Sequence, residues 1–173
     1  MSGGITETIL AFMDKGGDVL WLIAILVFVM WTLIFERFWF FTFVWRAERR
    51  LLVDKWETRA ERKSWNAKQI RSRLVSQSRE VINSNMSVIT TMVALCPLLG
   101  LLGTVTGMIE VFNVMAVTGG GDAKSMAGGV ERSTIPTMAG MVAALSGLFA
   151  NTYLQRIAER EQESLEDQLT SDH

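Results

Sequence analysis

Residues 95–108 read Leu-Cys-Pro-Leu-Leu-Gly-Leu-Leu-Gly-Thr-Val-Thr-Gly-Met, and this stretch decides the fold. It lies inside a longer run, 86–109, that contains no charged residue. About 20 consecutive apolar residues are enough to cross the hydrocarbon core of a bilayer as a helix. The run is therefore predicted to be a membrane-spanning helix.

The same stretch carries two different helix faces. Gly100, Gly103 and Gly107 recur at spacings of three and four residues, which places them on one side of a helix. Small residues on one face allow a second helix to approach closely inside a membrane. Thr104 and Pro97 fall on a neighbouring face, together with Thr90, Ala94, Leu101 and Met108. This pattern predicts a helix that takes part in an assembly.

Three long hydrophobic segments, 19–45, 86–117 and 133–155, account for much of a chain in which 49% of the residues are hydrophobic. Three helices that are apolar on all sides cannot bury one another in water, so a globular domain is excluded. The predicted fold is an all-α integral membrane protein with three transmembrane helices, the second and third of them extended. The remaining segments are 1–18, 46–85, 118–132 and 156–173.

The charge distribution predicts how these helices are oriented. Residues 46–80 contain eleven Lys and Arg against five Asp and Glu, whereas residues 154–173 contain six acidic residues and two arginines. An excess of basic residues marks a cytoplasmic loop, so the N-terminus and the loop 118–132 are predicted to be periplasmic and the C-terminus cytoplasmic. Within the basic segment, spacings such as Glu57/Glu61 and Arg59/Arg62/Lys63 are typical of a solvated helix.

A basic segment could also bind nucleic acid. Here the basic residues flank a membrane anchor and alternate with acidic residues, so topology explains them and no nucleic-acid binding is expected. The acidic tail is expected to continue the third helix and to form ion pairs with the basic segment, although such surface pairs add little stability.

The first hydrophobic segment is expected to remain in the membrane as an anchor. Residues 1–18 lack the positively charged start of a secretory signal peptide. Glu36 and Arg37 lie near one end of this segment, beside an aromatic cluster at 38–45. They are interpreted as an interfacial pair whose side chains extend to the membrane surface.

The third hydrophobic segment carries a continuous stripe of small and polar residues on one face: Ser133, Thr137, Gly140, Ala144, Gly147 and Asn151. The stripe could pack against the glycine face of the second helix, or it could line a central path. Packing is favoured for Gly140, Ala144 and Gly147. A further alternative is that Thr137 and Asn151 bond only to carbonyls of their own helix.

The residues needed for catalysis are largely missing. Cys96 is the only cysteine and His173 the only histidine, and no phosphate loop, nucleophile–base set or metal motif occurs. No enzyme activity and no cofactor or metal are expected, and Cys96 is interpreted as a small apolar helix residue. Glu110 and Glu131 lie toward the periplasmic side, so the spans have no titratable group at mid-depth. If protons cross here, a partner must supply the carrier.

The sequence Pro-Leu-Leu-Gly-Leu-Leu-Gly-Thr-Val-Thr-Gly-Met at 97–108, followed by Ile-Pro-Thr-Met-Ala-Gly-Met-Val-Ala-Ala-Leu at 135–145, resembles the ExbB/TolQ/MotA proton-channel family. Within that family it is most similar to short ExbB-type biopolymer transport proteins. The Leu-Trp-Leu-Ile at 20–23 and the Glu36-Arg37 pair are also similar to ExbB.

This resemblance implies a pentameric ring in the inner membrane of a Gram-negative bacterium. The ring would enclose the single-span helices of an ExbD-like partner, whose aspartate carries the proton, with protons as the coupling ion. The complex would drive a TonB-like protein and so energise outer-membrane import of siderophore iron, haem or vitamin B12. The family's pore threonines correspond to Thr104 and Thr137.

The sequence is also compatible with two other functions. One is a TolQ-like role in envelope integrity, and the other is a membrane scaffold that conducts no ion. A MotA-like flagellar role fits less well because the soluble loop is short.

The chain departs from the family pattern at two positions. The family glutamate five residues before the third-helix threonine is replaced by Arg132. Glu131 is one position earlier, and since a helix turns by about 100° per residue its side chain would point elsewhere. Glu131 is therefore only a weak candidate for the proton path. Pro136, directly before Thr137, is expected to reshape that end of the helix.

Overall fold

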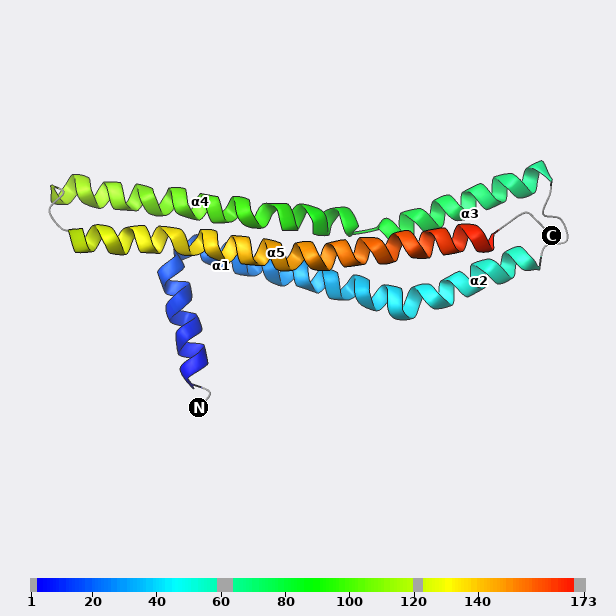
Figure 1. The fold of residues 1–173 in the computed structure, drawn as a ribbon, viewed down its shortest axis with the longest axis horizontal. Helices are drawn as coiled ribbons and strands as arrows, with labels where there is room; N and C mark the ends of the chain where they lie inside the picture. The colour runs from blue at the N-terminus through cyan, green and yellow to red at the C-terminus, as the bar shows by residue number, and fades with distance from the viewer. Residues whose placement is uncertain (1–2, 59–63, 120–122, 170–173) are drawn as a thin grey trace. The chain divides into compact units, whose positions relative to one another are not determined.

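The computed structural model describes residues 3–58, 64–119 and 123–169 (Figure 1). Its helices are α1 (Gly3–Trp39), the π-helix η1 (Phe40–Val44), α2 (Trp45–Glu57), α3 (Trp65–Asn83), α4 (Met86–Thr118) and α5 (Ala123–Gln168). Three helical stretches are long and apolar enough to span a membrane: Gly4–Glu57, Trp65–Thr118 and Met126–Gln168. The second of them contains both α3 and α4, which a short turn separates. The prediction of an all-α protein with three spanning helices, two of them extended, is confirmed.

The helices extend further than the hydrophobic pattern predicted. The first continues past Trp45 into α2, and most of the predicted loop 118–132 belongs to α5, which begins at Ala123. The acidic tail continues the third helix, as expected. The predicted pairings around residues 59–63 lie outside the described residues.

The chain forms two compact units. The first unit contains Met1–Trp31 and Thr90–Leu148, and the second contains Thr32–Ile89 and Phe149–His173. The first unit therefore holds most of α4 and the first half of α5, whereas the second holds α2, α3 and the end of α5.

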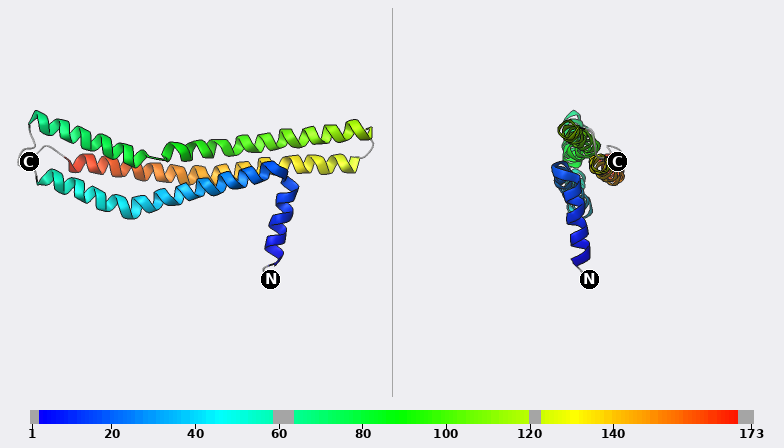
Figure 2. Two further views of the ribbon diagram at one scale, coloured as in Figure 1. Left: turned by 180° about the vertical axis from the view of Figure 1, so that it is seen from behind. Right: turned by 90° about the vertical axis from the view of Figure 1, so that its left-hand side faces the viewer.

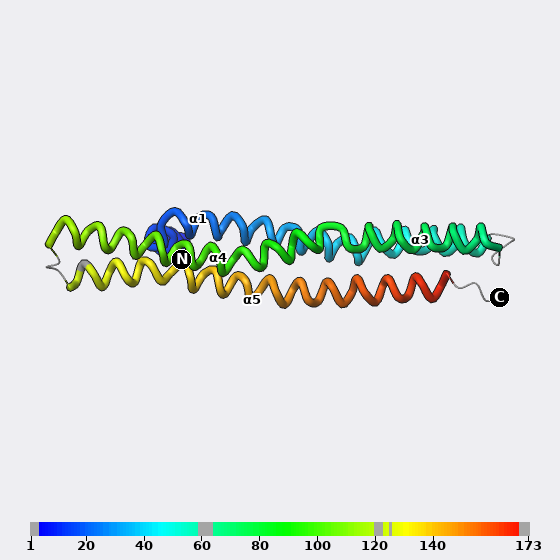
Figure 3. Tube along the Cα trace, turned by 90° about the horizontal axis from the view of Figure 1, so that it is seen from above, coloured from blue at the N-terminus to red at the C-terminus, as the bar shows by residue number. Residues whose placement is uncertain are grey.

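In the first unit, α4 and α5 run antiparallel and side by side (Figures 1 and 3). A Cβ atom built on Gly140 would lie 2.5 Å from the Cys96 carbonyl oxygen, and one built on Gly100 would lie 3.0 Å from the Pro136 carbonyl oxygen. Gly107 meets Ser133 in the same way. The two backbones are thus in contact along the glycine faces, the arrangement that small residues permit between membrane helices.

The first unit also contains a sharp bend in α1. Gly17 has φ +67° and ψ −165°, a backbone conformation that L side chains rarely adopt. The segment before Gly17 turns steeply away from the rest of α1 (Figures 1 and 2). Glycine therefore allows the chain to change direction there without a loop.

The second unit joins α2 and α3 to the end of α5. The buried Trp45 indole donates a hydrogen bond to Glu161 (3.0 Å), and Arg49 pairs with the same carboxylate at 3.0 Å. Arg79 pairs with Glu166 at 3.4 Å. The predicted attraction between the basic segment and the acidic tail is therefore present.

The side chain of Arg37 was predicted to extend to the membrane surface, and the structure places it elsewhere. It is buried, donates to the Val81 carbonyl oxygen at 3.3 Å and lies over the Phe40 ring at 5.0 Å. Its Nε is 3.2 Å from a Glu36 carboxylate oxygen. The last turn of a helix leaves carbonyl groups without partners, so Arg37 from α1 stabilises the end of α3 and is not free for the surface.

Candidate functional site

The two predicted pore threonines come together in the first unit. The hydroxyl of Thr104 on α4 hydrogen-bonds the hydroxyl of Thr137 on α5. Thr137 Oγ1 also donates to the Gly100 carbonyl oxygen at 2.9 Å, and Thr104 Oγ1 lies 3.4 Å from the same oxygen. Thr137 therefore bonds across the helix pair, and the alternative that it bonds only within its own helix is wrong.

Proton counting shows what this site can accept. Each hydroxyl has one proton to donate and two lone pairs that can accept. If Thr137 donates to Gly100 and Thr104 donates to Thr137, both protons are used. The lone pairs of Thr104 then remain available, so the site in this arrangement accepts a hydrogen bond from an approaching donor.

In the part of the chain that the structure describes, the α4 face next to Thr104 is exposed. Thr104 is half-buried, and the neighbours that share this face toward the start of α4 are exposed: Thr90, Ala94, Pro97 and Leu101. The glycine face, in contrast, is occupied by α5. On this side, Thr104 therefore lies next to exposed residues of α4 and not next to α5.

Of the predicted packing residues, the structure places Gly100, Gly103, Gly107 and Gly140 at the contact between α4 and α5. Gly100, Gly103 and Gly140 are buried, and a Cβ atom on Gly103 would overlap the Pro136 ring at 2.4 Å. A Cβ atom on Gly147 would overlap Met30 of α1. Ala144 is half-buried.

The helix α5 continues through Pro136. The ring of Pro136 fills the space beside Gly103. Because Pro136 packs against Gly103, the next residue, Thr137, lies beside Gly100 of α4.

The Gly100 carbonyl group is the part of the site that sequence reasoning missed. A signal for it exists, since Gly100 precedes Thr104 by four residues and a helical threonine often bonds the carbonyl four residues earlier. The bond from Thr137 has no such signal, because it depends on how the two helices are aligned.

Glu131 does not join the threonine pair. Its carboxylate lies 3.8 Å from Lys15 Nζ, and Arg132 donates to the Asp14 carbonyl oxygen at 3.3 Å. Both side chains are thus directed to α1. Among the described residues, no group of three or more His, Cys, Asp or Glu side chains could hold a metal ion.

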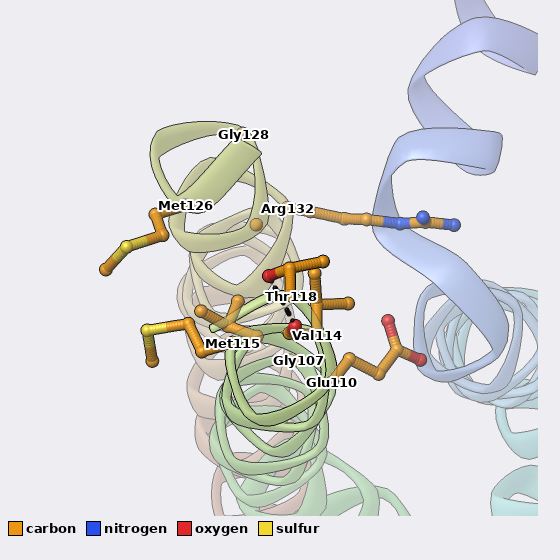
Figure 4. A pocket seen from close by; sticks show the side chains of 10 residues that line it. Gly107, Glu110, Val114, Met115, Thr118, Met126, Gly128 and Arg132 are labelled. Carbon is orange, nitrogen blue, oxygen red and sulfur yellow. Dashed lines mark hydrogen bonds between the residues drawn. The ribbon is translucent and has the colours of Figure 1, made fainter. Parts of the chain in front are cut away.

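A cavity of about 350 Å³ lies between α4 and α5 near the loop that joins them (Figure 4). Its walls include Gly107, Val111, Met115 and Met126. Arg132 also lines it, and in Figure 4 its side chain extends toward the ribbon of α1. The cavity is mainly apolar and is separate from the threonine pair.

Comparison with known proteins agrees with the sequence pattern. The model of the MotA/TolQ/ExbB proton channel family matches residues 45–167, which include both threonines and the glycine faces. No solved structure matches the chain significantly.

Several curated relatives carry ExbB names. Biopolymer transport protein exbB1 of Vibrio cholerae is 34% identical over 96 residues, covering 55% of this chain and 42% of that protein. A Synechocystis protein named ExbB-like 1 is 47% identical over 64 residues, covering 35% of this chain and 25% of its own length. Biopolymer transport protein ExbB of Helicobacter pylori is 33% identical over 75 residues, covering 43% of this chain and 52% of that protein. The matches therefore span between about a quarter and a half of these relatives.

Proposed function

Because this chain belongs to the MotA/TolQ/ExbB proton channel family, we propose that it is the channel-forming subunit of an inner-membrane complex that uses the proton-motive force for biopolymer transport. The chain is a multi-pass membrane protein. The observation that carries the proposal is the bonding of Thr104, Thr137 and the Gly100 carbonyl at an α4 face that the chain leaves open.

The proton carrier is a carboxyl group of a single-span partner helix. Between residues 86 and 109 of α4, and between 133 and 155 of α5, the chain has no charged side chain. A protonated carboxyl group can donate to the open lone pairs of Thr104. An ionised carboxylate needs a donor, so Thr104 must turn its proton away from Thr137. The pair thus bonds the carrier in both protonation states.

In the full proposal, several copies of the chain, five by family resemblance, form a ring around ExbD-like helices. The N-terminus is periplasmic and the C-terminus cytoplasmic, as the basic segment 46–80 favours. The complex drives a TonB-like protein that opens outer-membrane transporters for siderophore iron, haem or vitamin B12. One charge crossing 100 mV supplies about 2.3 kcal/mol. No enzyme activity, metal or cofactor is part of this mechanism.

The experiment is complementation of a bacterial strain that lacks its own copy of this chain. Replacing Thr104 and Thr137 together by valine removes both hydroxyl groups with little change in volume. We expect growth on a siderophore as the iron source to be lost while the amount of protein in the membrane stays normal. Thr106→Val is the matched control, because Thr106 is exposed and bonds only carbonyls of its own helix.

Two outcomes would contradict the proposal. Normal siderophore-dependent growth of the double variant would remove the threonines from the proton path. Loss of detergent resistance with normal iron uptake, in cells without the chain, would indicate a TolQ-like role in the envelope instead.

A further inference from the structure

A second cavity, of about 550 Å³, lies within the second unit. Pockets that hold small molecules occupy roughly 300–1,000 Å³, so this cavity is large enough for a ligand. Most of its wall is one face of α3, which runs beside the end of α5 (Figure 1). The lining residues are Trp56 of α2, Lys68, Arg71, Ser72, Val75, Ser76 and Arg79 of α3, and Glu166 of α5.

The residues that α3 contributes form a basic stripe, defined as Lys68, Arg71, Ser72, Val75, Ser76 and Arg79. They follow one another at spacings of three and one residues, which keeps all of them on one helix face. The stripe contains three cations, two hydroxyl groups and no acidic residue. It is therefore a row of hydrogen-bond donors along one side of the cavity.

Arg71 is held in the wall of the cavity by the end of α5. Its Nε donates to the Leu169 carbonyl oxygen at 2.5 Å, and its Nη2 donates to the Glu166 carbonyl oxygen at 3.1 Å. The last carbonyl groups of a helix have no partner within the helix, so Arg71 satisfies two acceptors of this kind. It has a structural task and also adds a fixed positive charge to the cavity.

The other donors of the stripe are less engaged. Arg79 pairs with the Glu166 carboxylate at 3.4 Å, but the two side chains are 59% and 37% exposed, and exposed pairs add little stability. Within the described residues, Lys68 forms no ion pair, and no hydrogen bond involves the hydroxyl group of Ser72 or Ser76. Three cations thus face one carboxylate, and the cavity has an excess of positive charge.

We propose that this cavity binds a small soluble anion that carries two or more phosphate groups. Phosphate oxygens accept strong, charge-assisted hydrogen bonds from Lys and Arg. Lys68 and Arg79 are eleven positions apart, a rise of about 16 Å along the helix. Their long side chains shorten this gap, but a single phosphate group does not bridge it. The ligand therefore needs a chain of phosphate groups.

The position of the stripe favours a soluble anion over a lipid headgroup. Lys68 lies eighteen positions before Met86, where the charge-free run of α4 begins, which corresponds to about 27 Å of helix. The headgroup layer of one leaflet is only about 5–7 Å thick. A lipid phosphate at that depth does not reach Lys68. The proposal does not depend on proton conduction.

Isothermal titration calorimetry of the full chain in phosphatidylcholine nanodiscs, without magnesium, tests the proposal. The probes are tripolyphosphate, ATP and orthophosphate. We expect tripolyphosphate and ATP to bind, and orthophosphate to bind at least about tenfold more weakly, because it loses at least one hydrogen bond to a charged group. Equal binding of the first two probes would mean that the phosphate chain alone is recognised, and tighter binding of ATP that the nucleoside also contributes.

Two outcomes of these titrations would overturn the proposal. One is that neither tripolyphosphate nor ATP binds, or that orthophosphate binds as tightly as they do. The other is that phosphatidylglycerol in the nanodisc abolishes tripolyphosphate binding, which would make the lipid headgroup the occupant of the cavity.

Charge variants test whether the stripe is the site. Lys68→Gln/Arg79→Gln should weaken tripolyphosphate binding about tenfold or more. Glu166→Gln should tighten it by up to about fivefold, because this carboxylate repels the anion and competes for Arg79. Arg73→Gln is the matched control, since Arg73 is an exposed arginine of α3 that does not line the cavity.

Effects in opposite directions separate a binding site from damage to the fold, which would only weaken binding. If the double variant does not accumulate, Lys68→Gln alone should weaken binding, since Lys68 is exposed and holds no other charged group in the described chain. Equal loss in Arg73→Gln would indicate a general attraction to the basic segment and would contradict the site. Unchanged binding in the variants of Lys68 and Glu166 would do the same.

Discussion

At the scale of single residues, glycine decides how close the helices can come. The contact between α4 and α5 is made by backbone against backbone, because a Cβ atom on Gly140 would lie 2.5 Å from the Cys96 carbonyl oxygen. That oxygen belongs to the backbone and cannot rotate aside as a flexible side chain could. The threonine bond across the two helices depends on this closeness, since Thr137 reaches the Gly100 carbonyl at 2.9 Å.

Gly140→Ala should therefore push α4 and α5 apart. Overpacking of this kind costs about 1–3 kcal/mol, so we expect a lower unfolding temperature for the purified protein in detergent. Gly128→Ala is the matched control, because nothing lies within 4 Å of its added Cβ and alanine favours helix by about 1 kcal/mol. Equal unfolding temperatures for the two variants would mean that the close contact is not required.

Sequence periodicity placed Gly100, Thr104 and Thr137 on particular helix faces, because spacings of three and four residues put side chains on one side of a helix. The family resemblance, and not periodicity, singled out the two threonines, and neither predicted that both would bond the Gly100 carbonyl group. Which residue of α5 faces which residue of α4 depends on the alignment of two helices that are separated by a loop. The interpretation of Arg37 was wrong for a similar reason: its partner, the Val81 carbonyl, lies 44 residues further along the chain.

At the scale of elements, hydrophobicity marks the membrane and not the ends of the helices. Residues 118–132 contain five glycines and were predicted to be a loop, yet residues 123–132 form the first turns of α5. The first spanning helix likewise continues into the polar helix α2 through η1. Helix propensity is a weak preference that packing overrides. In the second unit this packing depends on Glu161, whose carboxylate accepts hydrogen bonds from both Trp45 and Arg49.

Glu161→Ala should destabilise the second unit. It leaves the buried indole N–H of Trp45 without its acceptor, and an unsatisfied buried donor costs about 1–3 kcal/mol. Cleavage of the detergent-solubilised protein by a protease specific for Lys and Arg should become faster within α2. Glu163→Ala, an exposed position in the same helix, should leave the rate unchanged. The same increase in both variants would show that loss of charge, and not this hydrogen bond, is responsible.

At the scale of the whole molecule, the threonine pair lies in parts of α4 and α5, residues 86–109 and 133–155, that have no charged side chain. Pro97 and Leu101, which share the α4 face of Thr104, are exposed. This arrangement explains why the proposed function requires a partner whose carboxyl group reaches the threonines.

Proton uptake by liposomes tests this central claim most directly. The chain is reconstituted alone, with its single-span partner, and as the Thr104→Val/Thr137→Val variant with that partner, and an inward pH gradient is applied. We predict uptake only for the unmodified chain with its partner, while native mass spectrometry shows the same multi-copy complex for the variant. Equal uptake by the variant, or by the chain alone, would contradict the account.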